Sequence, residues 1–263
     1  MKYTRATVLL ALTAMGWLAA PATARADRLL AAVERPTAIR AWNGISAFSV
    51  YDSGAGVYRL AITGHEGPPA LVAVAPRTVP FDADVGPDFA MRPTIVHSRC
   101  AREQPGALSL PRRDCDIYRY SIALGVESKI SGADSDATSE FNPSIWRDQV
   151  AWVRTIDARP AATPRIYVRS LTAPRALRSR RLSLIGAKQC ASLAACGADV
   201  EEIELYGRRL AVTVNYGSGH RRGGICGLRE IHVQTIGERA QRLASQVCGL
   251  DLPRFRGVRL MLP

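Results

Sequence analysis

The sequence contains few aromatic residues and almost no lysine. Aromatic residues make up 6% of the 263 residues, and only three of the 35 basic residues are lysines. Proteins that hold single-stranded nucleic acid combine basic residues with aromatic side chains that stack on the bases. The densest basic stretch, Arg165 to Arg181, has only Tyr167 among its arginines. We therefore expect a solvated basic face and no nucleic-acid partner, while contact with anionic envelope polymers stays open.

The sequence also lacks a linker, a low-complexity tract and long helical periodicity, and its one long apolar run lies at the N-terminus. Lys2 and Arg5 precede the apolar residues 6–20, and small-x-small motifs follow up to Ala26. This order is typical of a secretory signal peptide, and the run is shorter than the roughly 20 residues of a spanning helix. We expect residues 1–26 to be removed, leaving residues 27–263 as a single secreted, extracytoplasmic domain with no transmembrane segment and a net charge near +9.

Short β-rich segments recur about every 50 residues. Each repeat predicts an entry segment followed by three further strands, with the second strand centred near residues 47, 96, 151 and 211. Four antiparallel strands per repeat are typical of a propeller blade. We therefore predict an all-β β-propeller. An ordinary β-sandwich with similar strands is the alternative.

The number of blades is left open by the two ends of the domain. Four complete repeats cover about residues 37–247, and residues 250–263 provide only two more strands, which predicts a partial fifth blade. A strand from residues 28–34 would complete that blade, because a ring must close to protect its sheet edges. The other possibility is a shortened version of a larger ring.

Six cysteines in an exported chain predict three disulfides. Paired C-x-x-C spacing is absent and the four histidines do not cluster with the cysteines, which disfavours a zinc site. Six cysteines allow fifteen pairings, and the blade model selects one of them. The selected pairs are Cys100 with Cys115, Cys190 with Cys196, and Cys226 with Cys248.

The repeats resemble a known group of proteins. The segments ISAFSVYDSGAGVYRLAI, SEFNPSIWRDQVAWVR and LYGRRLAVTVNYG resemble the exported TolB-like, WD40-like β-propellers of bacteria. The segments PFDADVGPD, PTIVHSRC and CDIYRY look like an actinobacterial branch of that group, to which no chemistry is assigned. The resemblance covers the whole mature chain and implies an interaction platform in the cell envelope. Fold-level likeness alone does not define an activity.

Acidic residues are the first candidates for a site. Asp82, Asp84 and Asp88 lie in one entry segment that would border the central channel, where some five-bladed propellers use carboxylates to hydrolyse glycosides. Capping of turns is the competing interpretation. Asp134 and Asp136, like Asp82 and Asp84, alternate as calcium ligands do, although neither pair has the glycine and distal glutamate of a full calcium loop.

His97 and Arg99 are the remaining candidates for binding. They occupy the strand positions at which another repeat has Trp152 and Arg154, so packing competes with a binding role. No catalytic residue is predicted, because the loop around Ser218 lacks the G-x-S-x-G pattern of a nucleophile elbow.

The sequence thus predicts a monomeric, exported, non-catalytic binding module without a cofactor, whose partner is an envelope protein or polymer. The alternative is a five-bladed carbohydrate-active hydrolase that uses channel carboxylates.

Overall fold

The computed structural model describes residues 32–35, 37–64, 67–102, 113–133, 137–156, 164–172, 180–182, 198–216, 228–236 and 241–247. Every regular element in these ranges is a β-strand, and none of them contains a helix that could cross a membrane. The predicted signal peptide and the partial fifth blade at residues 250–263 lie outside this part of the chain.

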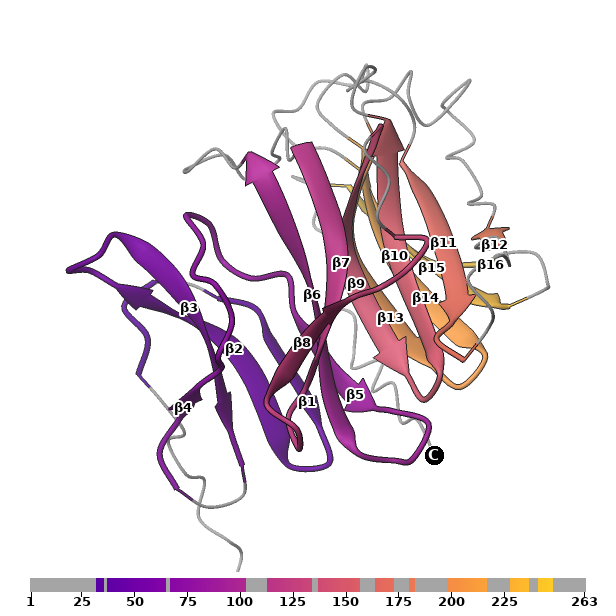
Figure 1. Ribbon diagram of the computed structural model, residues 1–263. Helices are drawn as coiled ribbons and strands as arrows, with labels where there is room; N and C mark the ends of the chain where they lie inside the picture. Colours follow the sequence, from indigo (N-terminus) through magenta and orange to yellow (C-terminus); the bar gives the residue numbers. More distant parts are fainter. Residues whose placement is uncertain are drawn as a thin grey trace, which may run out of the picture.

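The strands form four antiparallel sheets of four, in which neighbours in sequence are neighbours in space (Figure 1). The first sheet contains β1 (Ile39–Trp42), β2 (Ile45–Asp52), β3 (Val57–Thr63) and β4 (Ala70–Leu71). The second contains β5 (Asp84–Pro87), β6 (Pro93–Arg102), β7 (Arg113–Ser121) and β8 (Val126–Lys129). The third contains β9 (Thr138–Trp146), β10 (Gln149–Ile156), β11 (Arg165–Ser170) and β12 (Arg180–Leu182). The fourth contains β13 (Ala198–Tyr206), β14 (Arg209–Tyr216), β15 (Leu228–Thr235) and β16 (Gln241–Val247).

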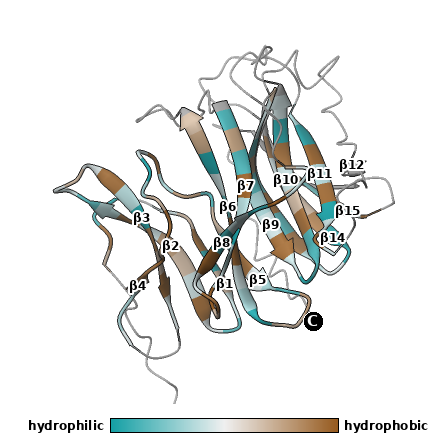
Figure 2. Cartoon of the chain, viewed as in Figure 1, coloured by the Kyte–Doolittle hydropathy of each residue, from teal (hydrophilic) through white to brown (hydrophobic). Residues whose placement is uncertain are grey.

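The sheets stack face to face as blades 1 to 4. Three hydrophobic cores lie between them, because strands of the middle blades carry apolar residues on both faces, as Val150 to Val153 of β10 do (Figure 2). Blades 1 and 2 share Leu60 and Ile95, blades 2 and 3 share Ile117 and Trp152, and blades 3 and 4 share many aliphatic residues of β10 and β14. The structure is a β-propeller, as predicted, and the sandwich alternative is wrong.

Tight turns join the first and second strands of the blades. Asn43 and Gly44 have φ angles of 46° and 73°, the left-handed pair that a two-residue hairpin turn requires. The second strands of the four repeats, β2, β6, β10 and β14, contain residues 47, 96, 151 and 211, where the sequence predicts them. The predicted strand at residues 28–34 is wrong in its described part, since residues 32–35 are not in a strand. Such a short segment has no alternating pattern to hold it to a sheet edge.

The disulfide between Cys100 and Cys115 is present, as predicted. These residues lie opposite each other on β6 and β7, so the bridge closes the base of the hairpin loop. The closed loop of about 15 residues is worth roughly 3 kcal/mol in the chain-entropy model. Cys190, Cys196, Cys226 and Cys248 lie outside the described residues.

The first strands of neighbouring blades approach closely at Gly86. A Cβ atom at this position would lie 2.3 Å from the carbonyl oxygen of Ile145 on β9. Backbone atoms cannot yield as a flexible side chain can, so only glycine allows β5 and β9 to pack at this distance.

We predict that Gly86→Ala lowers the free energy of unfolding by about 3 kcal/mol through overpacking. The control is Gly54→Ala, whose Cβ would be 3.5 Å from the nearest atom, the Asp52 Oδ1. Urea denaturation of both variants measures the difference. Equal stabilities would show that blades 2 and 3 separate without cost.

Candidate functional site

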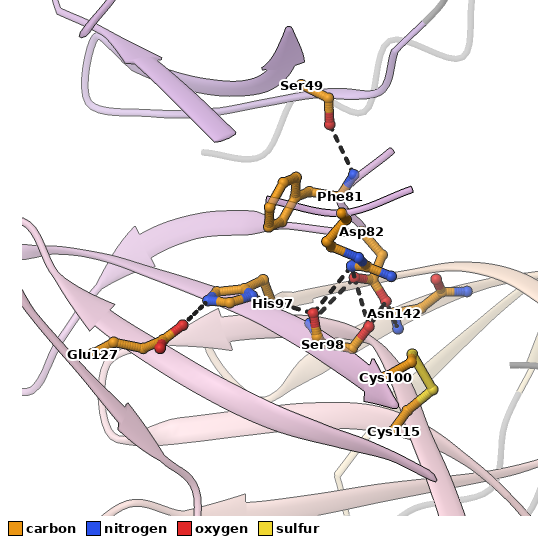
Figure 3. Close-up of polar contacts among 10 residues, drawn as sticks. Ser49, Phe81, Asp82, His97, Ser98, Cys100, Cys115, Glu127 and Asn142 are labelled. Atoms are coloured by element: carbon orange, nitrogen blue, oxygen red, sulfur yellow. Dashed lines mark hydrogen bonds and ion pairs between the residues drawn. A yellow bond between two sulfur atoms is a disulfide. The ribbon is translucent and has the colours of Figure 1, made fainter. Parts of the chain in front are cut away.

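Asp82 is a buried junction of three blades. Its Oδ1 accepts hydrogen bonds from Arg77 Nη1 at 2.9 Å and from the Ser98 backbone N–H at 3.1 Å. Its Oδ2 accepts from the Asn142 backbone N–H at 2.8 Å, and the Ser98 hydroxyl lies within 2.8 Å of both oxygens (Figure 3). Arg77 follows blade 1, Ser98 lies on β6 of blade 2, and Asn142 lies on β9 of blade 3. The carboxylate therefore joins blades and is enclosed by its partners.

Asp84 is also buried, at the centre of the propeller. Its Oδ2 accepts from the Ser144 hydroxyl at 2.7 Å and from the Ile145 backbone N–H at 2.9 Å. The Ser144 Oγ in turn accepts from the Leu205 backbone N–H at 2.8 Å. This chain of hydrogen bonds crosses β5, β9 and β13. Burial raises the pKa of Asp84, while these hydrogen bonds and the nearby Arg40 pull it down.

Beside Asp84, Arg40 of β1 meets two carboxylates of β13. It forms an ion pair with Glu202, and its Nε lies 4.0 Å from Glu204 Oε2. The side chains of Glu202 and Glu204 are 46% and 49% exposed. Loss of hydration and the Asp84 charge raise the pKa of Glu204 to about 7, against the opposing effect of Arg40. Carboxylates from blades 2 and 4 thus converge on a guanidinium from blade 1.

We call Arg40, Asp84, Glu202 and Glu204 the channel cluster. It contains the carboxylates that an acid–base site needs, but these carboxylates differ in their access to solvent. A general acid or base must reach the proton that it transfers. Asp84 is enclosed by Ser144 and the backbone of β9, whereas the two solvent-reaching carboxylates are neighbours on one strand and face Arg40. The arrangement can bind a polar group at the channel mouth, and it lacks two accessible acids from opposite sides.

Asp88 caps a tight turn. Turn capping is the role that the sequence offered for these acids as the alternative to catalysis. Its Oδ1 accepts from the backbone N–H groups of Ala90 and Arg92 at 2.8 Å, and its Oδ2 pairs with the Arg92 guanidinium. Burial alone would raise the pKa of Asp88, but the Arg92 backbone and side chain hold it below its ordinary value. The turn presents Phe89, which is 74% exposed, and Met91, whose φ is 61°.

His97 and Arg99 meet at one carboxylate. His97 is fully buried, with its Nε2 3.0 Å from Glu127 Oε1 (Figure 3), and Arg99 Nη1 donates to Glu127 Oε2 at 2.7 Å. Burial alone would raise the pKa of Glu127, but His97 and Arg99 hold it below its ordinary value. The His97 ring packs between Phe81 and Tyr118. His97 therefore has the packing position that its equivalence to Trp152 indicates, and Arg99 is its half-exposed neighbour.

Asp134 and Asp136, the alternating pair considered as calcium ligands, lie outside the described residues. In the part of the chain that the structure describes, no three His, Cys, Asp or Glu residues gather as metal ligands would.

Exposed apolar side chains lie on two turns at one end of blade 2. β5 and β7 run in the same direction, so the turn after each lies at the same end of the blade, the lower end in Figure 1. The first turn carries Phe89 and Met91, and the second carries Leu124 and leads into the exposed Val126. We call Phe89, Met91, Leu124 and Val126 the turn patch. The backbone of Arg147, in the β9–β10 turn, forms an isolated parallel β-bridge with Asp88, next to the turn patch.

Sequence reasoning missed Arg40, Glu202, Glu204 and the turn patch. The two glutamates have a local signal, because they alternate on a strand whose other face is apolar. Arg40 has none, since its neighbours come from a blade more than 150 residues away. The exposed Phe89 and Met91 follow a turn-capping aspartate, and that pattern was available in the sequence.

Buried Glu140 on β9 forms a separate polar cluster. Its Oε1 lies 2.6 Å from both Thr138 Oγ1 and Arg154 Nε, while its buried Oε2 has no hydrogen-bond partner among the described residues. Burial raises the pKa of Glu140 to about 7, although Thr138 and Arg154 oppose the shift.

Comparison with known proteins gives structural likeness only. No family model matches the chain, and no curated protein matches it. TolB from Acinetobacter baumannii is similar with a TM-score of 0.46 and 10% identity, over 81% of this chain and 43% of that one. The β-propeller domain of the Trilobed protease from Pyrococcus furiosus has a TM-score of 0.43 and 8% identity, over 79% and 57%. The GH43 endo-arabinanase from Bacillus licheniformis has a TM-score of 0.39 and 8% identity, over 75% and 69%. The chain thus spans less than two thirds of the first two structures, and at these identities the three assign it no activity.

We predict that Asp82→Asn lowers the free energy of unfolding by about 3–5 kcal/mol, because it leaves the buried Arg77 charge without this counter-charge. Asp88→Asn, which removes an exposed ion pair and keeps a turn-capping side chain, should cost about 1 kcal/mol or less. Urea unfolding compares the two variants, and similar losses would contradict the role of Asp82 as a junction.

Acidification should stabilise the protein through Glu140. A folded-state pKa of about 7, above the ordinary 4.5, means that the folded state binds the proton more tightly than the unfolded state. The free energy of unfolding therefore falls as pH rises from about 4.5 to about 7, by an amount on the order of 3 kcal/mol. Glu140→Gln should flatten this part of the stability profile. An unchanged slope would show that the Arg154 pairing cancels the effect of burial.

Proposed function

We propose that this chain is an exported β-propeller that binds a protein of the bacterial cell envelope at the turn patch and catalyses no reaction. The observation that carries the proposal is the fixed presentation of Phe89. Asp88 holds the turn through two backbone N–H groups and the Arg92 side chain, and Met91 adopts a left-handed conformation that non-glycine residues rarely use. A preformed apolar turn loses little conformational entropy on binding.

The surroundings of the turn patch also fit a protein partner. Aromatic residues, methionine and arginine are the residue types enriched at protein–protein interfaces. Phe89 and Met91 provide the apolar part, and Arg92 and Arg147 lie beside it with exposed side chains. The resemblance to TolB-like propellers supports an envelope location, and the Cys100–Cys115 disulfide is of the kind that persists outside the cytoplasm.

The second candidate function is glycoside hydrolysis in the channel. It is favoured by the convergence of Asp84 and Glu204 from two blades, and by the pKa of about 7 at Glu204, which suits a general acid. Its weakness is the enclosure of Asp84 by hydrogen bonds from Ser144 and Ile145.

The test uses residues 27–263 immobilised as bait for envelope extract, and compares the unaltered chain with Phe89→Asp and with Glu202→Gln/Glu204→Gln. We expect one retained protein whose affinity falls roughly 30-fold with Phe89→Asp, the loss of a hot-spot aromatic. The channel variant should retain it fully.

Retention that survives Phe89→Asp would contradict the turn patch as the binding site. Release of reducing sugar from an envelope or plant polysaccharide, abolished by Glu204→Gln, would establish the hydrolase instead.

A further inference from the structure

The turns that follow the first strands of blades 2, 3 and 4 lie next to one another. Asp88 and Arg147 form a parallel β-bridge, which places the β5–β6 turn beside the β9–β10 turn. Trp146 and Tyr206 directly precede the turns of blades 3 and 4, and the centroids of their rings are 4.0 Å apart. The three turns therefore follow one another along the end of the propeller that carries the turn patch, the lower end in Figure 1.

Each of these three turns carries an exposed arginine. The side chain of Arg92 is 55% exposed, and Arg147 and Arg208 are exposed residues of the next two turns. We call Arg92, Arg147 and Arg208 the arginine arc. Neighbouring sheets pack about 10 Å apart, so the arc extends over about 20 Å. Phe89 and Met91 of the turn patch lie at its blade 2 end.

The two aspartates of these turns are already engaged. Asp88 pairs with Arg92 at 2.8 Å, so this arginine has a counter-charge within its own turn. Asp148 follows Arg147 in the chain, and its Oδ2 accepts a hydrogen bond from the Ser170 hydroxyl at 2.8 Å. The carboxylate of Asp148 is therefore directed to β11 of its own blade.

The other two arginines of the arc have no such counter-charge. Among the described residues, neither Arg147 nor Arg208 forms an ion pair, and Arg208 Nη2 donates to the uncharged carbonyl oxygen of Ile236 at 3.0 Å. Glu204, two residues before Tyr206 on β13, lies near Arg40 of the channel cluster. Two guanidinium groups of neighbouring turns are thus available to an anionic partner.

The combination of charge and apolar surface indicates the kind of partner. An arginine side chain binds carboxylates and phosphates through two parallel hydrogen bonds. Phe89 and Met91, at one end of the arc, require apolar side chains opposite them. A polymer of sugar or glycerol phosphates has the anionic groups but no apolar side chains, whereas one face of a protein can present both. The excess of basic residues in the whole chain would also speed the encounter with an acidic protein.

We infer that the partner of the turn patch is an acidic protein, whose carboxylates pair with Arg147 and Arg208 while its apolar side chains pack on Phe89 and Met91. The inference rests on the proposed function and specifies the chemistry of its partner.

Binding of fluorescein-labelled poly-L-glutamate, followed by fluorescence anisotropy, tests the arginine arc directly. Residues 27–263 are compared with Arg147→Gln/Arg208→Gln and with the control Arg35→Gln/Arg119→Gln, which removes the same charge from exposed positions outside the arc. We expect about tenfold weaker binding with the arc variant and less than about twofold with the control. Arg147→Lys/Arg208→Lys should restore most of the affinity, and thermal melting verifies that each variant is folded.

Equal weakening by the arc variant and the control would show that the probe senses net charge alone, and would overturn the inference. Tighter binding of a glycerol-phosphate polymer, lipoteichoic acid, than of poly-L-glutamate would also overturn it, because the arc would then select phosphate.

Capture from envelope extract separates this inference from the proposed function. The protein retained by the unaltered chain should bind about tenfold more weakly to Arg147→Gln/Arg208→Gln, and its binding should weaken as NaCl is raised. Full capture by the arc variant together with loss on Phe89→Asp would leave the turn patch as the binding site and overturn the acidic partner. Capture that is unaffected by Phe89→Asp would instead contradict the proposed function itself.

Discussion

The propeller depends on buried carboxylates that hydrogen-bond across the first strands of its blades. Asp82 connects the segment after blade 1 with blades 2 and 3, and Asp84 connects blade 2 with blade 3 and, through Ser144, with blade 4. The backbone N–H groups near the axis would otherwise be buried without acceptors, which is costly. Apolar cores hold neighbouring sheets together, but these hydrogen bonds determine how the sheets are aligned.

This use of acids bears directly on function. Two of the three aspartates in the segment 82–88 are enclosed by the fold, and the third shapes an exposed turn. A carboxylate that is buried among its own hydrogen-bond donors is not accessible to a ligand. The side chains that a ligand can reach therefore belong to other residues, namely the apolar turn patch and the Glu202–Glu204 pair on β13.

Much of the fold could be predicted because each blade is a local structure. The apolar run Val150-Ala151-Trp152-Val153 identifies a strand that is buried on both faces, and Asn43-Gly44 specifies the first hairpin of blade 1. The Cys100–Cys115 pair followed from the hairpin that it closes. The strand expected at residues 28–34 failed over residues 32–35, where no repeat or turn supports the prediction.

The sequence by itself determined the blade, the repeat and the first disulfide, because these depend on residues close together in the chain. Only the tertiary structure decided which acids are enclosed and which are accessible. Asp82 meets Asn142 across 60 residues, and Arg40 meets Glu202 across an even longer separation. The physical reason is that the stacking of one blade on the next, which no local pattern encodes, sets the solvent access and the partners of every residue near the axis.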